Sequence, residues 1–184
     1  MAFETRSHLK HEFHEGQLYS MAGAKRNHST ISTNLIGELH TFLKGRSCEV
    51  HGPDMKVRIE SRREVHFVYP DVSITCSTDD QQHNRDFIHH PVLIAEVLSH
   101  STEAYDRGEK FNLYKRLTSL EDYVLINSHI KRVEIFHKIP DQLNSWMLTT
   151  YEAGENFVLA STEFQGSVDQ LYDKVIFEEM SRLR

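Results

Sequence analysis

Three segments decide the fold: Tyr69-Pro70-Asp71-Val72-Ser73-Ile74, Ile94-Ala95-Glu96-Val97-Leu98-Ser99 and Asp106-Arg107-Gly108-Glu109-Lys110. The first two are apolar, strand-like runs that each carry one carboxylate, and the third carries a lysine on a predicted helix. Asp71 and Glu96 lie 25 residues apart, which leaves room for one strand, a loop and a second strand. Two acids on neighbouring strands can hold a hard divalent cation. A nearby ammonium can then balance the charge that develops on a reacting phosphate.

These segments belong to a longer set of motifs that resembles a known family. The motifs are Pro70-Asp71, Glu96-Val97-Leu98-Ser99 followed by Ser101-Thr102, Asp106 with Lys110 and Tyr114, and Asp122-Tyr123-Val124-Leu125-Ile126. In this order they look like the Uma-two family of restriction-endonuclease-like proteins, within the PD-(D/E)XK nuclease superfamily, from about Glu12 to about Phe177. The resemblance implies a restriction endonuclease-like α/β core with Asp71 and Glu96 on adjacent strands.

Length and composition indicate one globular domain over residues 1–184, with 39% hydrophobic and 26% charged residues. No window approaches the roughly 18 apolar residues of a membrane span, so we expect no membrane partner. The N-terminal residues Met1 to Arg6 lack an apolar signal core, which predicts a cytoplasmic protein. For that reason we expect Cys48 and Cys76 to remain reduced.

The net charge of −6 argues against a protein coated in phosphate-binding surface, although it allows a local basic patch. The 13 histidines include neighbours such as His89 and His90, which could suggest zinc. No Cys/His set has the spacing of a zinc finger, and the His-Glu-x-x-His motif is absent. We therefore interpret the histidines as ordinary surface or partly buried residues.

Apolar periodicity and turn residues predict a mixed sheet flanked by helices, which is an α/β (α+β) arrangement. The expected helices are His28–Leu43 with Asn27 as N-cap, Glu103–Leu117, and Val168–Phe177. The expected strands are a hairpin within Glu12–Met21, and Cys48–His51, Met55–Ile59, Val65–Thr75, Val92–Leu98, Tyr123–Ile126, Arg132–Phe136, Trp146–Tyr151 and Phe157–Leu159. Residues Asp79–His90 are polar and aperiodic, so we expect a loop there.

Each candidate site residue also has a structural interpretation. Glu96 interrupts an apolar run and is expensive to bury alone, so it either binds a metal or reaches solvent or an arginine at the strand end. Asp71 follows a proline and could simply start a turn. Lys110 lies four residues after Asp106 and could form only a surface ion pair with it. The combination of Asp71, Glu96 and the family resemblance favours a metal site.

The chain departs from the superfamily pattern at Leu98, where a lysine is expected two residues after the second acid. The resemblance suggests that Lys110 on the following helix has taken over that role. Asp54 is either a secondary ligand or a turn residue. Glu38 could face the site from the first helix, although a solvated helix residue is the favoured interpretation. Seven basic residues could contact phosphate, with a solvated surface as the default interpretation of each: Lys56, Arg58, Arg62, Arg63, Lys131, Arg132 and Lys138.

The sequence therefore predicts an endonuclease that hydrolyses phosphodiester bonds in DNA. Asp71 and Glu96 would bind Mg²⁺ or Mn²⁺, and Lys110 would complete the catalytic set. One alternative is a catalytically inactive nuclease-fold protein that acts in nucleic-acid binding or regulation. Another is a protein that uses its apolar strands for protein–protein assembly, and a homodimer is possible.

Overall fold

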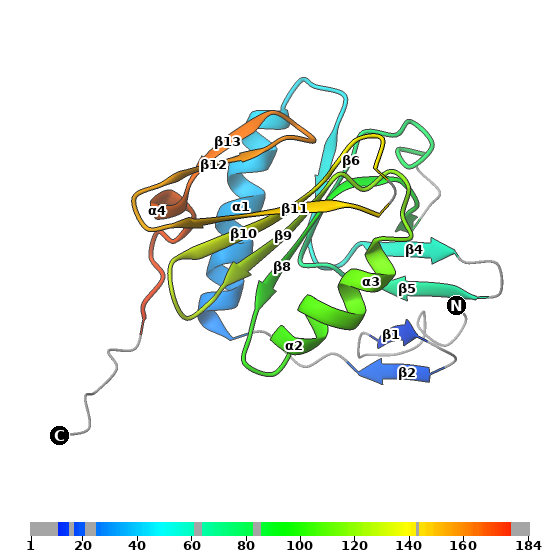
Figure 1. The fold of residues 1–184 in the computed structure, drawn as a ribbon, viewed down its shortest axis with the longest axis horizontal. Coiled ribbons are helices and arrows are strands. Elements are labelled where there is room, and N and C mark those ends of the chain that lie inside the picture. The colour runs from blue at the N-terminus through cyan, green and yellow to red at the C-terminus, as the bar shows by residue number, and fades with distance from the viewer. Residues whose placement is uncertain are drawn as a thin grey trace.

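In a computed structural model, the described residues are 11–14, 17–20, 25–60, 64–82, 86–142 and 144–177. The described strands form three sheets, and the largest has the order β11-β10-β9-β8-β6-β3. The fold is a mixed α+β arrangement, as the sequence predicts (Figure 1). Among the helices of the described ranges, none is both long and apolar enough to cross a membrane.

The long helix α1 (Arg26–Leu43) covers one face of the main sheet. Its buried residues Ile31, Leu35, Leu39 and Leu43 recur every four positions, so they form one apolar face. The predicted boundary is wrong by two residues, because Lys25 is the N-cap and the Asn27 side chain instead donates to the Ile176 carbonyl. The helix ends just before Gly45, whose φ of 79° suits a residue without a side chain.

The central strand of the main sheet is β8 (Pro91–Leu98), and seven of its eight residues are buried. It pairs antiparallel with β6 (Val72–Thr75) and parallel with β9 (Asp122–Asn127). The sheet continues from β9 through β10 (Arg132–Lys138) to the edge strand β11 (Trp146–Glu152), and from β6 to the edge strand β3 (Glu49–His51). A strand covered on both faces explains the nearly continuous apolar run that the sequence shows here.

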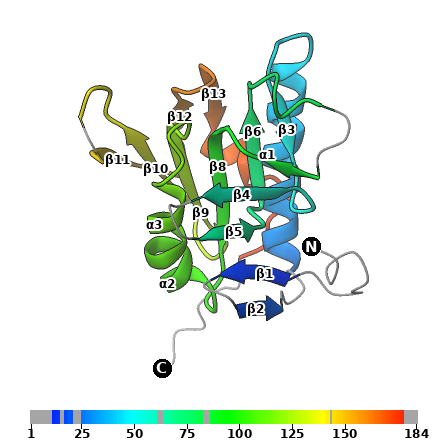
Figure 2. The same ribbon diagram turned by 90° about the vertical axis from the view of Figure 1, so that its right-hand side faces the viewer.

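The two faces of β8 belong to two hydrophobic cores. Leu93, Ala95 and Val97 face the core under α1, whereas Ile94 and Leu98 face a second core. Figure 2 shows α1 and the α2–α3 segment on opposite sides of β8. Glu96 alternates with Ala95 and Val97, so it shares the face of Ile94 and Leu98. The acid therefore lies under the α2–α3 segment.

That segment comprises α2 (Glu103–Tyr105), a π-helical turn η2 (Asp106–Lys110) and α3 (Phe111–Tyr114). The prediction of a helix here is confirmed, although regular helix ends three residues before the expected Leu117. A π-helical turn inserts an extra residue into a helix and is found often at functional sites. Here the turn begins at Asp106 and ends at Lys110, and both residues are buried.

A second sheet has the order β2-β1-β5-β4-β7 and lies beside the main one (Figure 2). The predicted N-terminal hairpin is confirmed as β1 (His11–His14) and β2 (Gln17–Ser20), although its turn at Glu15 and Gly16 lies outside the described residues. The strands β4 (Lys56–Glu60) and β5 (Val65–Val68) form an antiparallel pair. The short strand β7 (Phe87–Ile88) pairs with β4 inside the region expected to be a loop.

The prediction of one strand over Val65–Thr75 is wrong. Residues 69–71 are not in a strand, and they connect β5 in one sheet with β6 in the other. Pro70 lies at this break because it has no N–H for a ladder and restricts the residue before it. As a result, Asp71 stands immediately before β6, at the end of the main sheet.

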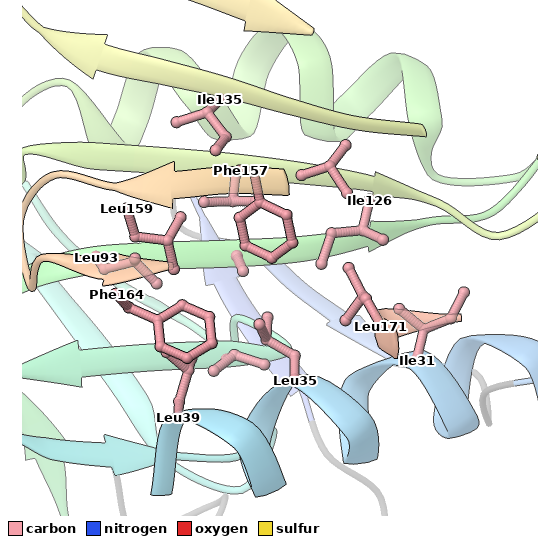
Figure 3. Packing of buried hydrophobic residues seen from close by; sticks show 14 of the residues in the cluster. Ile31, Leu35, Leu39, Leu93, Ile126, Ile135, Phe157, Leu159, Phe164 and Leu171 are labelled. Carbon is pink, nitrogen blue, oxygen red and sulfur yellow. The ribbon is translucent and has the colours of Figure 1, made fainter. Parts of the chain in front are cut away.

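The C-terminal elements extend the core under α1. The strands β12 (Asn156–Leu159) and β13 (Phe164–Ser167) form a hairpin, and α4 (Val168–Leu171) follows it. Figure 3 shows Phe157, Leu159 and Phe164 packed over Leu35 and Leu39 of α1. The prediction of a helix to Phe177 is wrong, since Tyr172–Lys174 form a turn instead and Lys174 has a φ of 60°.

The expectation that both cysteines stay reduced is also wrong, because Cys48 and Cys76 form a disulfide. Their chain positions explain the pairing. Glu49 in β3 lies opposite Thr75 in β6. Cys48 precedes Glu49 and Cys76 follows Thr75, so the two cysteines are also neighbours. The linear sequence separates the two cysteines by 28 residues and gives no sign of this register.

Candidate active site

The candidate site lies at the end of the main sheet where β6 begins and β8 ends. Val72 in β6 pairs with Ala95 in β8, so the next position along each strand brings Asp71 beside Glu96. The two acids therefore come from neighbouring strands. Figure 1 shows that α1 and α2 also begin at this end of the sheet. Residues far apart in the sequence thus converge at this end.

Asp71 is held by two groups that contact the same carboxylate oxygen. The Val97 N–H donates a hydrogen bond of 2.7 Å to Oδ2, and Nε2 of His28 lies 3.1 Å from that oxygen. His28 belongs to the first turn of α1, which explains how the start of this helix is fixed against the sheet. The Val97 bond also ties Asp71 to the strand that carries Glu96.

Glu96 is held by Lys110 and Tyr114, and both contact its Oε1. The Lys110 ammonium lies 2.9 Å from this oxygen, and the Tyr114 hydroxyl donates to it at 2.7 Å. Asp106 adds a second acid, with its Oδ1 3.8 Å from the same ammonium. Glu96 and Asp106 are each 3% exposed and Lys110 is 5% exposed, so this ion-pair network is almost completely buried.

Burial changes the protonation equilibria of these groups. It raises the pKa of Glu96 well above the ordinary value; the Lys110 ammonium opposes this shift, and the charges of Asp106 and Asp71 reinforce it. Burial on its own would lower the pKa of His28. The hydrogen bond to Asp71 and the negative charges of Asp71 and Asp106 outweigh that effect, so the pKa of His28 is raised. The site therefore favours positive charge beside its carboxylates.

The donor set was tested for its fit to a divalent cation. Within the described ranges, no three His, Cys, Asp or Glu side chains form a ready-made metal cluster. However, the contacts above use only Oδ2 of Asp71 and Oε1 of Glu96. Oδ1 and Oε2 lie outside them and are hard oxygen donors. Mg²⁺ is commonly bound through one or two carboxylates together with water and substrate phosphates, so a two-carboxylate site fits it.

Two further candidates from the sequence do not join this group. Asp54 is exposed in the turn before β4, where the Met55 N–H donates to the Gly52 carbonyl. Glu38 lies ten residues beyond His28 on α1, roughly 15 Å along the helix axis, and lines a shallow depression with Asn34 and Asp173. Asp54 therefore acts as a turn residue, and Glu38 faces the α4 side of the helix.

Sequence reasoning missed His28 and underestimated two tyrosines. His28 was one of 13 histidines without a metal-binding spacing, and nothing local marks it as a partner of Asp71. Tyr114 appears in the sequence only as part of the family motif, whereas in the structure its hydroxyl donates directly to Glu96. The Tyr123 hydroxyl donates to the Asp106 carbonyl at 2.8 Å and so supports the π-helical turn. A buried tyrosine needs a hydrogen-bond partner, which was the available signal.

The sequence of this chain matches a known protein family. The family model described as "Uma2: Putative restriction endonuclease" matches residues 2–170. The chain belongs to the Uma2 family. The match includes Asp71, Glu96 and Lys110, and it confirms the resemblance that the sequence motifs carry. Uma2 membership supports assigning the protein to the nucleases and suggests an interaction with nucleic acid.

Two curated relatives come from Synechocystis sp. The uncharacterized protein slr1290 is 38% identical over 96% of this chain and 90% of its own length. The uncharacterized protein sll1609 is 36% identical over 80% of this chain and 81% of its own. Both matches are extensive, and neither relative's name states an activity.

A solved structure supports the fold. The crystal structure of "a putative nuclease belonging to DUF820" from Anabaena variabilis is similar to this Uma2 protein with a TM-score of 0.73. The similarity covers 92% of this chain and 93% of the other, at 15% identity. At that identity the comparison establishes the shared architecture alone. It confirms the restriction endonuclease-like fold expected from the motifs.

Proposed function

We propose that this protein is a metal-dependent endonuclease that hydrolyses phosphodiester bonds in DNA. The observation that carries the proposal is the buried contact between Glu96 and Lys110 beside Asp71, in a chain of the Uma2 family. A carboxylate pair that can hold a metal and an ammonium that can balance charge on the phosphate are groups that metal-assisted phosphodiester hydrolysis can use. Cytoplasmic location and homodimer formation remain predictions.

Asp71 and Glu96 would hold Mg²⁺ or Mn²⁺ through Oδ1 and Oε2, which lie outside the contacts given above for the described residues. When bound, the cation supplies a water of lowered pKa and polarises the phosphate. The chain orients both carboxylates in advance, because His28 and Val97 hold Asp71 while Lys110 and Tyr114 hold Glu96. Such preorganisation avoids rearrangement during the reaction.

Lys110 would act on the substrate by stabilising the negative charge that develops on the phosphate or by orienting the attacking water. Its ammonium lies against Glu96 and 3.8 Å from Asp106, so two carboxylates hold it in place. The burial of this group strengthens its electrostatic effect, since the local dielectric is low. With Lys110 in this role, the site would not need a lysine at position 98, where this chain has leucine.

A nuclease-fold protein that binds nucleic acid without cleaving it is the second candidate. The observation that favours it is the engagement of Glu96 by both Lys110 and Tyr114, at 3% exposure. The deciding experiment incubates the purified protein with single-stranded, duplex and branched DNA in Mg²⁺, Mn²⁺ or EDTA. Cleavage with metal, absent in EDTA and in Asp71→Asn, supports the nuclease. DNA binding without cleavage under every condition supports the second candidate.

Metal binding should also be visible without any substrate. Two nearby carboxylates repel each other, so a cation that binds only the folded state raises the melting temperature. Wild-type protein is expected to show a rise with millimolar Mn²⁺ that is lost in Asp71→Asn. Asp54→Asn is the matched control, because this exposed acid lies in a turn, and it should keep the full rise. An equal rise in wild type and Asp71→Asn, measured by thermal unfolding, would exclude the site.

A further inference from the structure

Three chain segments meet around the candidate site and form its rim. Contacts between His28 and Asp71 fix the start of α1 there, and β8 ends in the loop Ser99–Thr102. The loop after β9 joins them, because Leu98 pairs with Asn127 and the Ser128 hydroxyl donates to the Leu98 carbonyl. Any polymer that reaches Glu96 and Lys110 has to cross this rim.

The rim carries two cations that are not used elsewhere in the fold. Lys25 and Arg26, at the start of α1, are both exposed, and neither forms an ion pair with a residue in the described ranges. The basic residues that the sequence suggests as phosphate contacts, where the structure describes them, differ from Lys25 and Arg26 because each already has a partner in the protein. Lys56 pairs with Asp86, Arg58 with Glu60, Lys131 with Asp169 and Arg132 with Glu152, and the Lys138 ammonium donates to the Thr118 carbonyl.

The opposite part of the rim presents aromatic and hydroxyl groups. His100, after β8, and His129, after β9, are exposed and stack with ring centroids 3.7 Å apart and an interplanar angle of 15°. Beside them, the Ser99 hydroxyl lies 3.0 Å from both the Ser101 and the Thr102 hydroxyls. Imidazole and hydroxyl groups donate hydrogen bonds to phosphate oxygens, and a histidine ring can stack on a base.

The charge of the molecule makes such a rim necessary for a DNA substrate. The net charge is −6, and Asp71, Glu96 and Asp106 concentrate negative charge at the site itself. A polyanion approaches acids of this kind only where nearby cations offset the repulsion. Lys25 and Arg26 lie three and two residues before His28, and His28 contacts Asp71. They are therefore the cations best placed to do so.

We infer that a DNA strand lies across this rim, with its phosphates on Lys25 and Arg26 on one side and its nucleotides on His100 and His129 on the other. The inference rests on the proposed function for its substrate class, and it assigns the residues that grip the strand. Ser101 and Thr102 add phosphate contacts beside the histidine pair.

The test measures binding of fluorescently labelled DNA, single-stranded and duplex, by anisotropy in Mg²⁺ at several salt concentrations. The Glu96→Gln protein is used, since it should bind without cutting. Lys25→Gln/Arg26→Gln in that background is expected to weaken binding about tenfold or more. The slope of log K against log salt should fall by about 2 on duplex, because each lost phosphate contact removes roughly 0.9. His100→Ala should weaken binding independently.

Lys44→Gln is the matched control, because Lys44 is the C-cap of the same helix and lies roughly 28 Å from Lys25. It should leave affinity and salt slope unchanged. Equal affinity and slope for Glu96→Gln with and without the Lys25/Arg26 changes would overturn the inference, and so would no binding at all by Glu96→Gln. If binding depends on Lys25 and Arg26 but wild type cleaves no DNA, this inference holds and the proposed nuclease activity fails.

Discussion

Replacing Lys110 by methionine is expected to lower the rate of DNA cleavage by about 100- to 1,000-fold, the loss typical of removing one preorganised group that stabilises developing charge. Methionine keeps most of the volume of the lysine stem and removes only the ammonium that contacts Glu96. The rate is measured under single-turnover conditions with saturating Mn²⁺. Lys115→Met is the matched control, because Lys115 follows α3 and its ammonium covers the Phe111 ring outside the site.

Loss of folding has to be separated from loss of chemistry. Circular dichroism at the assay temperature gives the folded fraction of each variant, and Lys110→Gln provides a second test because its amide can still donate to Glu96. Both folded variants should remain slow at any Mn²⁺ concentration. A rate within about threefold of wild type would remove Lys110 from the catalytic set. Full recovery at high Mn²⁺ would instead assign Lys110 to metal retention.

The positions of Asp71, Glu96 and Lys110 could be anticipated because each depends on a local signal. An acid inside a buried apolar run is costly without a partner, and this marks Glu96. Pro70 cannot donate to a strand ladder and so marks an irregular position beside Asp71, although the change of sheet at residues 69–71 is seen only in the structure. Leu98 occupies the position where the superfamily has lysine, which directs attention to Lys110 on the next helix. The Glu96–Lys110 contact of 2.9 Å agrees with that substitution.

Other features could not be predicted, because they depend on how distant segments meet. His28 contacts Asp71 only after α1 has packed across the sheet, and the two residues are 43 positions apart. The Cys48–Cys76 disulfide depends on the register between β3 and β6. Local periodicity also fails where a backbone irregularity intervenes. The sequence Asp106–Lys110 has a helical pattern, yet it forms a π-helical turn inside the helix.

Lys110 is also expected to have a large effect on stability, since its removal leaves a buried acid without its cation. Removing one partner of a buried ion pair typically destabilises a protein by about 3–5 kcal/mol, so Lys110→Met should lower the free energy of unfolding by that amount at pH 8. Glu96→Gln/Lys110→Met removes both charges of this pair and should recover the part of the loss that comes from an unpaired Glu96, because Tyr114 can still donate to the amide oxygen. Asp106 stays in place in both variants. Urea denaturation of wild type, both single variants and the double variant gives the coupling energy.

The pH dependence of this loss identifies its cause. Burial raises the pKa of Glu96 in the folded state, and Lys110→Met removes an ammonium that opposes that shift. A carboxyl whose pKa is higher in the folded state stabilises the protein below its unfolded pKa, and this stability is lost as pH rises through the folded pKa. The difference in free energy of unfolding between wild type and Lys110→Met, both without metal, should therefore be smaller at pH 5 than at pH 8. The double variant lacks the Glu96 carboxyl, so the part of the pH dependence that comes from Glu96 should be absent from it. A deficit of Lys110→Met that is equal at both pH values would show that lost packing, rather than an unpaired Glu96, destabilises the variant.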